Sequence, residues 1–228
     1  MFADDSGWDA IHSLLMIVGA LLAIWSQSTM GLFLLAAGSF TYYNTLNTGV
    51  VHTYKPFRTY ANWITASRLL ILLILLAFWV KIPHLYFLGA LLIIVLLDGV
   101  DGHVARRYNQ ESEWGRAYDV EVDSLYVLFG CIYLYLQNIT PLWIIIPGVM
   151  RYSYIIILKI LNPPVQKERK NKIASYVAGL FFVSLLWSVA QQSDIQSIVL
   201  MVSSALIVIS FLISYYYLWI DNQNGSSS

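Results

Sequence analysis

The chain has 228 residues, of which 58% are hydrophobic and 11% are charged, whereas about 25% of the residues of a typical soluble domain are charged. Its 13 basic and 13 acidic side chains give a formal net charge of zero, so no overall field favours a nucleic-acid partner. The single cysteine, Cys131, excludes an internal disulfide. This composition excludes a soluble domain and indicates an all-α integral membrane protein.

Eight apolar stretches are long enough to cross a bilayer as helices, which takes about 20 residues each. They are residues 11–26, 29–47, 63–80, 84–106, 119–137, 141–161, 174–191 and 195–217. In the first two stretches, small residues would allow close helix approach, as they do in membrane interfaces; these residues are Gly19, Gly31, Ala36, Ala37 and Gly38. These two helices are expected to pack on the rest of the chain or to shape a groove. Residues 51–62 mix aromatic and basic side chains, which favours either an interfacial segment or a plain connector.

Most basic side chains lie in loops on one side of the predicted bundle. These loops contain Lys55, Arg58, Arg106, Arg107, Arg116, Lys167, Arg169, Lys170 and Lys172. The positive-inside rule places this side in the cytoplasm. Counted along their predicted helices at a rise of 1.5 Å per residue, Asp98 and Asp123 each lie about 21–22 Å from the helix end on the non-cytoplasmic side. Both therefore reach the cytoplasmic third of a hydrocarbon core about 30 Å thick.

Residues 97–123 concentrate acidic side chains at helical intervals. Asp98 and Asp101 are three residues apart, and Asp119 and Asp123 are four residues apart, so each pair shares one helix face. Ionised carboxylates at the margin of the hydrocarbon are costly unless something neutralises them. Four acids with few inward-facing bases predict divalent metal binding, and oxygen ligands favour Mg²⁺, Mn²⁺ or Ca²⁺ over Zn²⁺.

The helix flank beside the first acidic pair has little side-chain bulk. Gly102 follows Asp101 directly and Ala105 lies about one turn later, so a flat ligand can approach the backbone there. Arg106 and Arg107 come next, and guanidinium groups bind phosphate oxygens in a forked geometry. The sequence therefore predicts a metal site next to a site for a phosphorylated ligand.

The acidic stretch has a fixed order of residues and gaps. It is Asp98, two residues, Asp101, Gly102, two residues, Ala105, Arg106, eight residues, Gly115, three residues, Asp119, three residues and Asp123. This pattern resembles the signature of the CDP-alcohol phosphatidyltransferase family, and residues 62–68 (NWITASR) are similar to the segment that opens the family's first core helix. The resemblance implies a six-helix catalytic core over 63–219. We expect two additional helices within 1–50, an interfacial segment at 51–62 and a flexible tail at 220–228.

The resemblance also implies roles for individual residues. Asp98, Asp101, Asp119 and Asp123 would bind two divalent cations, Mg²⁺ or Mn²⁺, and Asp123 would accept the proton of the acceptor hydroxyl as general base. The nucleotide would lie against Asp98, Gly102, Ala105, Arg106 and Gly115. Glu121, two residues from Asp119, points away from the acidic pair and is expected to support the site from outside or to face lipid.

The implied reaction moves a phosphatidyl group from CDP-diacylglycerol to an acceptor hydroxyl and releases CMP. If Arg151 and the basic loop form an anion pocket, the acceptor carries a phosphate, as glycerol 3-phosphate or inositol phosphate does; the pocket residues would be Arg151, Lys167, Arg169, Lys170 and Lys172. If these cations only set topology, the same core would suit an uncharged or zwitterionic acceptor, or a CDP-choline or CDP-ethanolamine reaction on diacylglycerol. The chain resembles compact bacterial members, which implies the inner membrane, a cytoplasmic active site and a possible homodimer.

A function of another class is also compatible with acids in a membrane. Intramembrane carboxylates mark ion pathways in channels and transporters. The acids of this chain gather at one depth, however, and the sequence contains no paired interrupted segments of the kind transporters use. A structural bundle stabilised by metal is a third reading, and we favour the enzyme.

Overall fold

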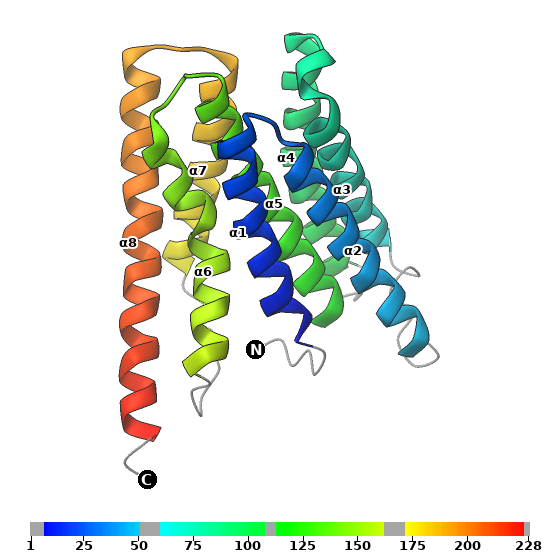
Figure 1. Cartoon of the computed structure of the whole chain (residues 1–228), viewed down its shortest axis with the longest axis vertical. Helices are drawn as coiled ribbons and strands as arrows, with labels where there is room; N and C mark the ends of the chain where they lie inside the picture. The colour runs from blue at the N-terminus through cyan, green and yellow to red at the C-terminus, as the bar shows by residue number, and fades with distance from the viewer. Residues whose placement is uncertain (1–6, 51–59, 108–112, 162–171, 226–228) are drawn as a thin grey trace. The chain divides into compact units, whose positions relative to one another are not determined.

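The structure is a computed structural model that describes residues 7–50, 60–107, 113–161 and 172–225. Within these ranges it does not describe the side chains of residues 46–50, 100–107, 113–114, 172–173 and 221–225. The described residues are helical throughout apart from short turns, and they contain no strand. The elements are α1 (Trp8–Ser26), α2 (Met30–Val50), α3 (Tyr60–Phe78), η2 (Trp79–Lys81), α4 (His84–Arg107), α5 (Glu113–Leu136), η3 (Leu142–Ile144), α6 (Ile145–Leu161), α7 (Lys172–Ala190) and α8 (Asp194–Gly225) (Figure 1).

The expectation of an all-helical fold is confirmed for the described residues, and each predicted stretch overlaps one α-helix. Four apolar segments of the described chain are long enough to cross a membrane, namely Trp8–Ser26, Tyr60–Lys81, Leu142–Leu161 and Asp194–Ile220. Two shorter apolar helices cover His84–Gly99 and Ala174–Ala190. The count of eight spans and the boundaries of a six-helix core stay predictions.

Two helices extend beyond the stretches expected from hydropathy. α5 begins at Glu113, before the predicted start at 119, and α8 continues to Gly225, into the stretch 220–228 for which the sequence predicts a flexible tail. Extending a formed helix costs far less than nucleating one. Polar residues at the end of an apolar helix therefore continue it until a glycine or a turn ends it. The predicted interfacial segment 51–62 lies mostly outside the described residues, and α3 begins at Tyr60 within it.

The short turns after α1 and α5 use the left-handed backbone region. Gln27 and Asn138 both have φ of 54°. In each case the next residue donates its backbone N–H to a carbonyl five residues earlier, Ser28 to Ala23 at 3.2 Å and Ile139 to Leu134 at 2.9 Å. This is the hydrogen-bond pattern of a Schellman motif, which satisfies carbonyls at the helix end. Both turns are therefore closed by local hydrogen bonds.

The chain divides into two compact units by its internal contacts. One unit comprises the described residues between 19 and 129, and the other comprises the described residues at 7–18 and 130–225. α1 and α5 each run from one unit into the other, since their bounds cross residues 18 and 129.

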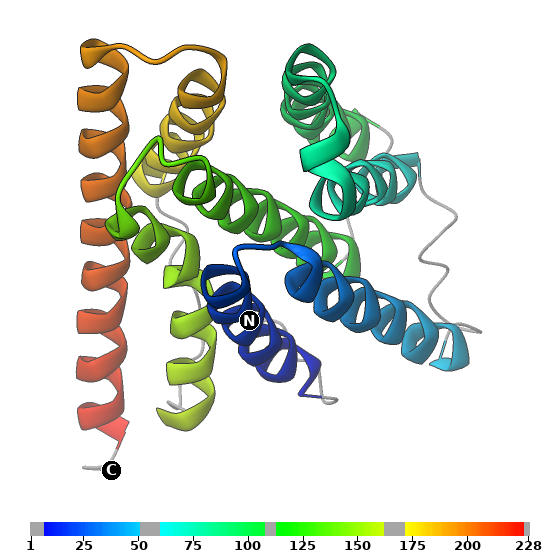
Figure 2. The same cartoon turned by 45° about the horizontal axis from the view of Figure 1, so that its top comes forward.

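In the unit of residues 19–129, α3 lies along α4 and α2 contacts α3 (Figure 2). Gly19 of α1 faces α2 so closely that a Cβ there would stand 3.1 Å from the Cα of Leu32. A Cβ on Gly31 would lie 3.3 Å from the Cβ of Leu22. Close approach at Gly19 and Gly31 is thus confirmed. At Gly38 a Cβ would meet no described atom within 4 Å, so close approach is not seen there among the described residues.

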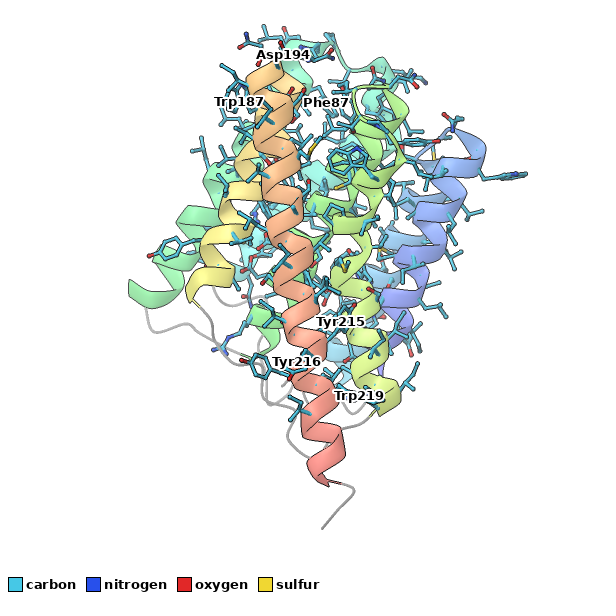
Figure 3. The ribbon with its side chains drawn as sticks, turned by 90° about the vertical axis from the view of Figure 1, so that its left-hand side faces the viewer. Phe87, Trp187, Asp194, Tyr215, Tyr216 and Trp219 are labelled. Atoms are coloured by element: carbon cyan, nitrogen blue, oxygen red, sulfur yellow. The ribbon has the colours of Figure 1, made fainter. Side chains whose placement is uncertain are left out.

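In the other unit, α6 and α7 both pack against α8. The hydroxyls of Ser184 on α7 and Ser203 on α8 are 2.8 Å apart, and both side chains are buried. Figure 3 shows Tyr215, Tyr216 and Trp219 along the second half of α8. The Tyr215 hydroxyl lies 2.8 Å from the hydroxyl of Ser153 on α6, whereas Tyr216 and Trp219 are exposed. Hydrogen bonds between serine and tyrosine side chains therefore supplement the apolar packing of these three helices.

The first turns of α1 also belong to this unit and contact α6 through aromatic rings. His12 is fully buried, stacks on Trp8 with ring centroids 4.6 Å apart and lies 6.0 Å from the ring of Tyr152 on α6. Lys159 of α6 lies 3.8 Å from the carboxylate of Asp9. The first N-terminal helix is thereby joined to the C-terminal part of the chain, a long-range contact that hydropathy does not predict.

Candidate metal centre

Three of the four predicted metal ligands come together in the unit of residues 19–129. Asp98 lies on α4, and Asp119 and Asp123 lie one turn apart on α5. One carboxylate oxygen from each lies within 4.8 Å of the others. The i,i+4 spacing places Asp119 and Asp123 on one face of α5, as predicted, and the packing of the unit adds Asp98 from a second helix.

A basic side chain for which the sequence predicted no role lies among these carboxylates. Arg68 of α3 is completely buried. Its Nη1 donates to Asp119 at 2.8 Å, and its Nη2 lies 3.0 Å from Asp98 and also donates to Asp123. The premise that few bases face the acids therefore needs correction. A signal was present, because Arg68 is the one charged residue in the sequence of α3, and an ionisable residue inside a membrane helix is a functional candidate by default.

The donor set fits a divalent cation of the hard type. With all three carboxylates ionised, they and one guanidinium would leave two negative charges in excess. The side chains of Asp98, Asp119 and Asp123 remain 40%, 34% and 28% exposed, respectively, so an ion and a ligand can reach them. Oxygen donors with excess negative charge match Mg²⁺ or Mn²⁺ better than Zn²⁺.

The other predicted ligands are placed less completely. Asp101, Gly102, Ala105 and Arg106 lie on α4 after Asp98, with side chains outside the description. Gly115 is the third residue of α5 and is half-buried. Because α4 is continuous from His84 to Arg107, Asp101 lies about one turn from Asp98. Its role as a metal ligand stays a prediction, as do the nucleotide contacts.

The residues predicted to bind the acceptor belong to other parts of the chain. Arg151 lies on α6 and is partly exposed. Lys167, Arg169 and Lys170 lie outside the described residues, and Lys172 is the first residue of α7, with an undescribed side chain. The acceptor pocket stays a prediction.

Two neighbours of the aspartates on α5 are buried. Glu121 is only 3% exposed, so of its two predicted environments the structure excludes the lipid-facing one. Tyr118, next to Asp119, is also buried, and its ring contacts α2. It stacks on Tyr43 with centroids 6.4 Å apart and meets Phe40 edge-on at 5.7 Å. α2 therefore contacts α5 through the ring of Tyr118, the residue that precedes Asp119.

Comparisons with known proteins identify similar sequences, and the family model covers the residues of the site. The sequence model of the CDP-alcohol phosphatidyltransferase family matches residues 58–215. A CDP-diacylglycerol--glycerol-3-phosphate 3-phosphatidyltransferase of Wigglesworthia glossinidia brevipalpis is 29% identical over 171 residues, which cover 69% of this chain and 93% of the relative. The protein of the same name from Haemophilus influenzae is 26% identical, and the aligned region covers 64% of this chain and 85% of the relative. A cardiolipin synthase (CMP-forming) of Streptomyces coelicolor is 34% identical over 44% of this chain and 51% of the relative. No solved structure matches.

Proposed function

Because the chain belongs to the CDP-alcohol phosphatidyltransferase family, we propose that it transfers a phosphatidyl group from CDP-diacylglycerol to the hydroxyl of an acceptor alcohol. Two relatives that match most of their own length are named for CDP-diacylglycerol and glycerol 3-phosphate, so glycerol 3-phosphate is the proposed acceptor. The observation that carries the proposal is the convergence of Asp98, Asp119 and Asp123 within 4.8 Å. These are signature positions, and their packing gathers the charge that a metal-dependent transfer needs.

The residues of the site have distinct proposed roles. Asp98, Asp119 and Asp123, together with Asp101, would hold two divalent cations. Such ions supply Lewis-acid stabilisation of the charge on a diphosphate during in-line displacement. Gly102 and Ala105 would leave room for the cytidine, Gly115 would let α5 begin close to the nucleotide, and Arg106 would hold the diphosphate.

The proposed transfer exchanges one phosphorus–oxygen bond for another. The acceptor oxygen attacks the phosphorus atom that bears the diacylglycerol, and its proton passes to the carboxylate of Asp123. The bond from that phosphorus to the CMP oxygen breaks, and CMP leaves with the electron pair. The product is phosphatidylglycerophosphate when the acceptor is glycerol 3-phosphate.

The proposed setting is the inner membrane of a bacterium, with eight spans and the aspartates open to the cytoplasm. The support is the concentration of lysine and arginine in one set of loops, which the positive-inside rule places in the cytoplasm. A soluble acceptor and a lipid donor can meet in the cytoplasmic third of the membrane, where the sequence places the aspartates. Arg151 and the basic residues 167–172 are the proposed contacts for the acceptor phosphate.

The proposal is tested with the purified protein in detergent micelles supplied with CDP-diacylglycerol and Mg²⁺ or Mn²⁺. Separate reactions contain glycerol 3-phosphate, inositol phosphate or phosphatidylglycerol, and one contains CDP-choline with diacylglycerol. CMP release and the mass of the lipid product are measured. We expect CMP and phosphatidylglycerophosphate with glycerol 3-phosphate, and loss of both when a chelator removes the metal. CMP release that is indifferent to the chelator would contradict the metal site, and absence of CMP with every acceptor would contradict the transfer.

A further inference from the structure

We propose that Arg68 is a positioning residue that holds the three carboxylates in the arrangement needed for metal binding. The inference rests on the proposed function, because it concerns the same metal site. It goes beyond the metal ligands and nucleotide contacts of the signature, since Arg68 lies on α3, thirty residues before Asp98. Arg68 would act through the aspartates and would not itself contact the metal.

The geometry connects three helices through one side chain. Nη1 of Arg68 lies 2.8 Å from Oδ1 of Asp119, and Nη2 lies 3.0 Å from Oδ1 of Asp98 and also pairs with Asp123. The arginine is fully buried, whereas the three carboxylates are partly exposed. The guanidinium therefore approaches the cluster from inside the unit, and solvent reaches the carboxylates.

The planar fork of arginine explains why this residue type suits the position. Three carboxylates this close repel one another, and without a cation their side chains would turn apart to reduce the repulsion. A guanidinium presents several N–H donors in fixed directions, so one side chain can engage more than one carboxylate. A carboxylate has two oxygens and several lone pairs, so it can accept from arginine and also coordinate an ion.

The two possible roles of Arg68, as a nearby positive charge or as a positioning residue, predict opposite changes in metal affinity when Arg68 is removed. If Arg68 acted only as a positive charge near the ions, its removal would relieve repulsion and tighten metal binding. If it positions the carboxylates, its removal weakens binding even though a repulsive charge is gone. Loss of a group that orients metal ligands typically weakens metal affinity about 10–100-fold. The sign of the change therefore separates the two roles.

The test measures Mn²⁺ affinity of the full-length protein in detergent by electron paramagnetic resonance, which reads the free ion without any substrate. The variants are Arg68→Met, which removes the charge, and Arg68→Lys, which keeps the charge but loses the fork. The matched control is Arg116→Lys on the exposed surface of α5. We expect about 10–100-fold weaker binding for Arg68→Met, a smaller loss for Arg68→Lys and no change for the control. The Mn²⁺ concentration that half-activates CMP release should shift by the same factors.

Folding is checked by size-exclusion chromatography and by thermal unfolding with chelator present. A purely structural role would lower the unfolding temperature and leave the Mn²⁺ affinity of the folded protein unchanged, which would overturn the inference. Equal or tighter binding by both variants would also overturn it. If Arg68→Met does not fold, the lysine variant alone decides between these outcomes. Failure of the unaltered protein to bind Mn²⁺ would instead contradict the proposed metal site.

Discussion

Replacing Thr29 with valine should loosen the attachment of the turn between α1 and α2 to α3. The Thr29 hydroxyl is buried, donates to the carbonyl of Leu76 at 2.5 Å and accepts from the indole N–H of Trp79 at 2.8 Å. Valine has nearly the same shape but can make neither hydrogen bond. Each neutral hydrogen bond contributes about 0.5–1.5 kcal/mol to stability, so Thr29→Val should lower the free energy of unfolding by about 1–3 kcal/mol.

The assay is reversible unfolding in mixed detergent micelles, followed by circular dichroism. Thr29→Ser is the matched control, because serine keeps the hydroxyl and should retain most of the stability. Combining Thr29→Val with Trp79→Phe completes a double-mutant cycle, in which the coupling energy of the pair should be about 0.5–1.5 kcal/mol. A valine variant as stable as the original protein, or a serine variant as unstable as the valine variant, would refute the reasoning.

Two further changes address the site itself. Asp123→Asn should reduce CMP release by about 10²–10⁴-fold if the carboxylate accepts the proton of the acceptor hydroxyl. The control, Asp194→Asn at the exposed start of α8, should leave CMP release unchanged. Appreciable turnover by the Asp123 variant in the CMP assay would remove the role of general base assigned to Asp123. Phe40→Leu removes the edge-to-face contact with Tyr118 and should cost about 0.5–1.5 kcal/mol beyond the lost buried area. Its control is Tyr42→Leu on the exposed side of α2. Equal free energies of unfolding for the Phe40 and Tyr42 variants would argue against a stabilising contact between α2 and α5.

Local features of this protein were predictable because they depend on residues close together in the chain. Hydropathy located each helix, since a bilayer admits only segments that satisfy their own backbone hydrogen bonds. The helical period placed Asp119 and Asp123 on one face. Small residues predicted the close approach at Gly19, although Gly38 shows that a small residue permits contact without causing it.

Contacts between distant segments were not predictable in the same way. The aromatic contact of Tyr118 with α2 joins residues about 75 positions apart, and no periodicity within either helix specifies its partner. Arg68 is the clearest case. No role was predicted for it from the sequence, and the identity of its partners depends on how α3, α4 and α5 pack.

By itself, the sequence determined which segments are helical, that they belong in a membrane, and that acidic pairs share helix faces, because these properties follow from composition and from the period of 3.6 residues. Only the tertiary structure decided that Asp98 joins Asp119 and Asp123 around the guanidinium of Arg68. The physical reason is that mutual repulsion of carboxylates can be relieved by a metal ion or by a basic side chain. Which basic side chain lies beside the carboxylates depends on what the neighbouring helix brings to that point in space.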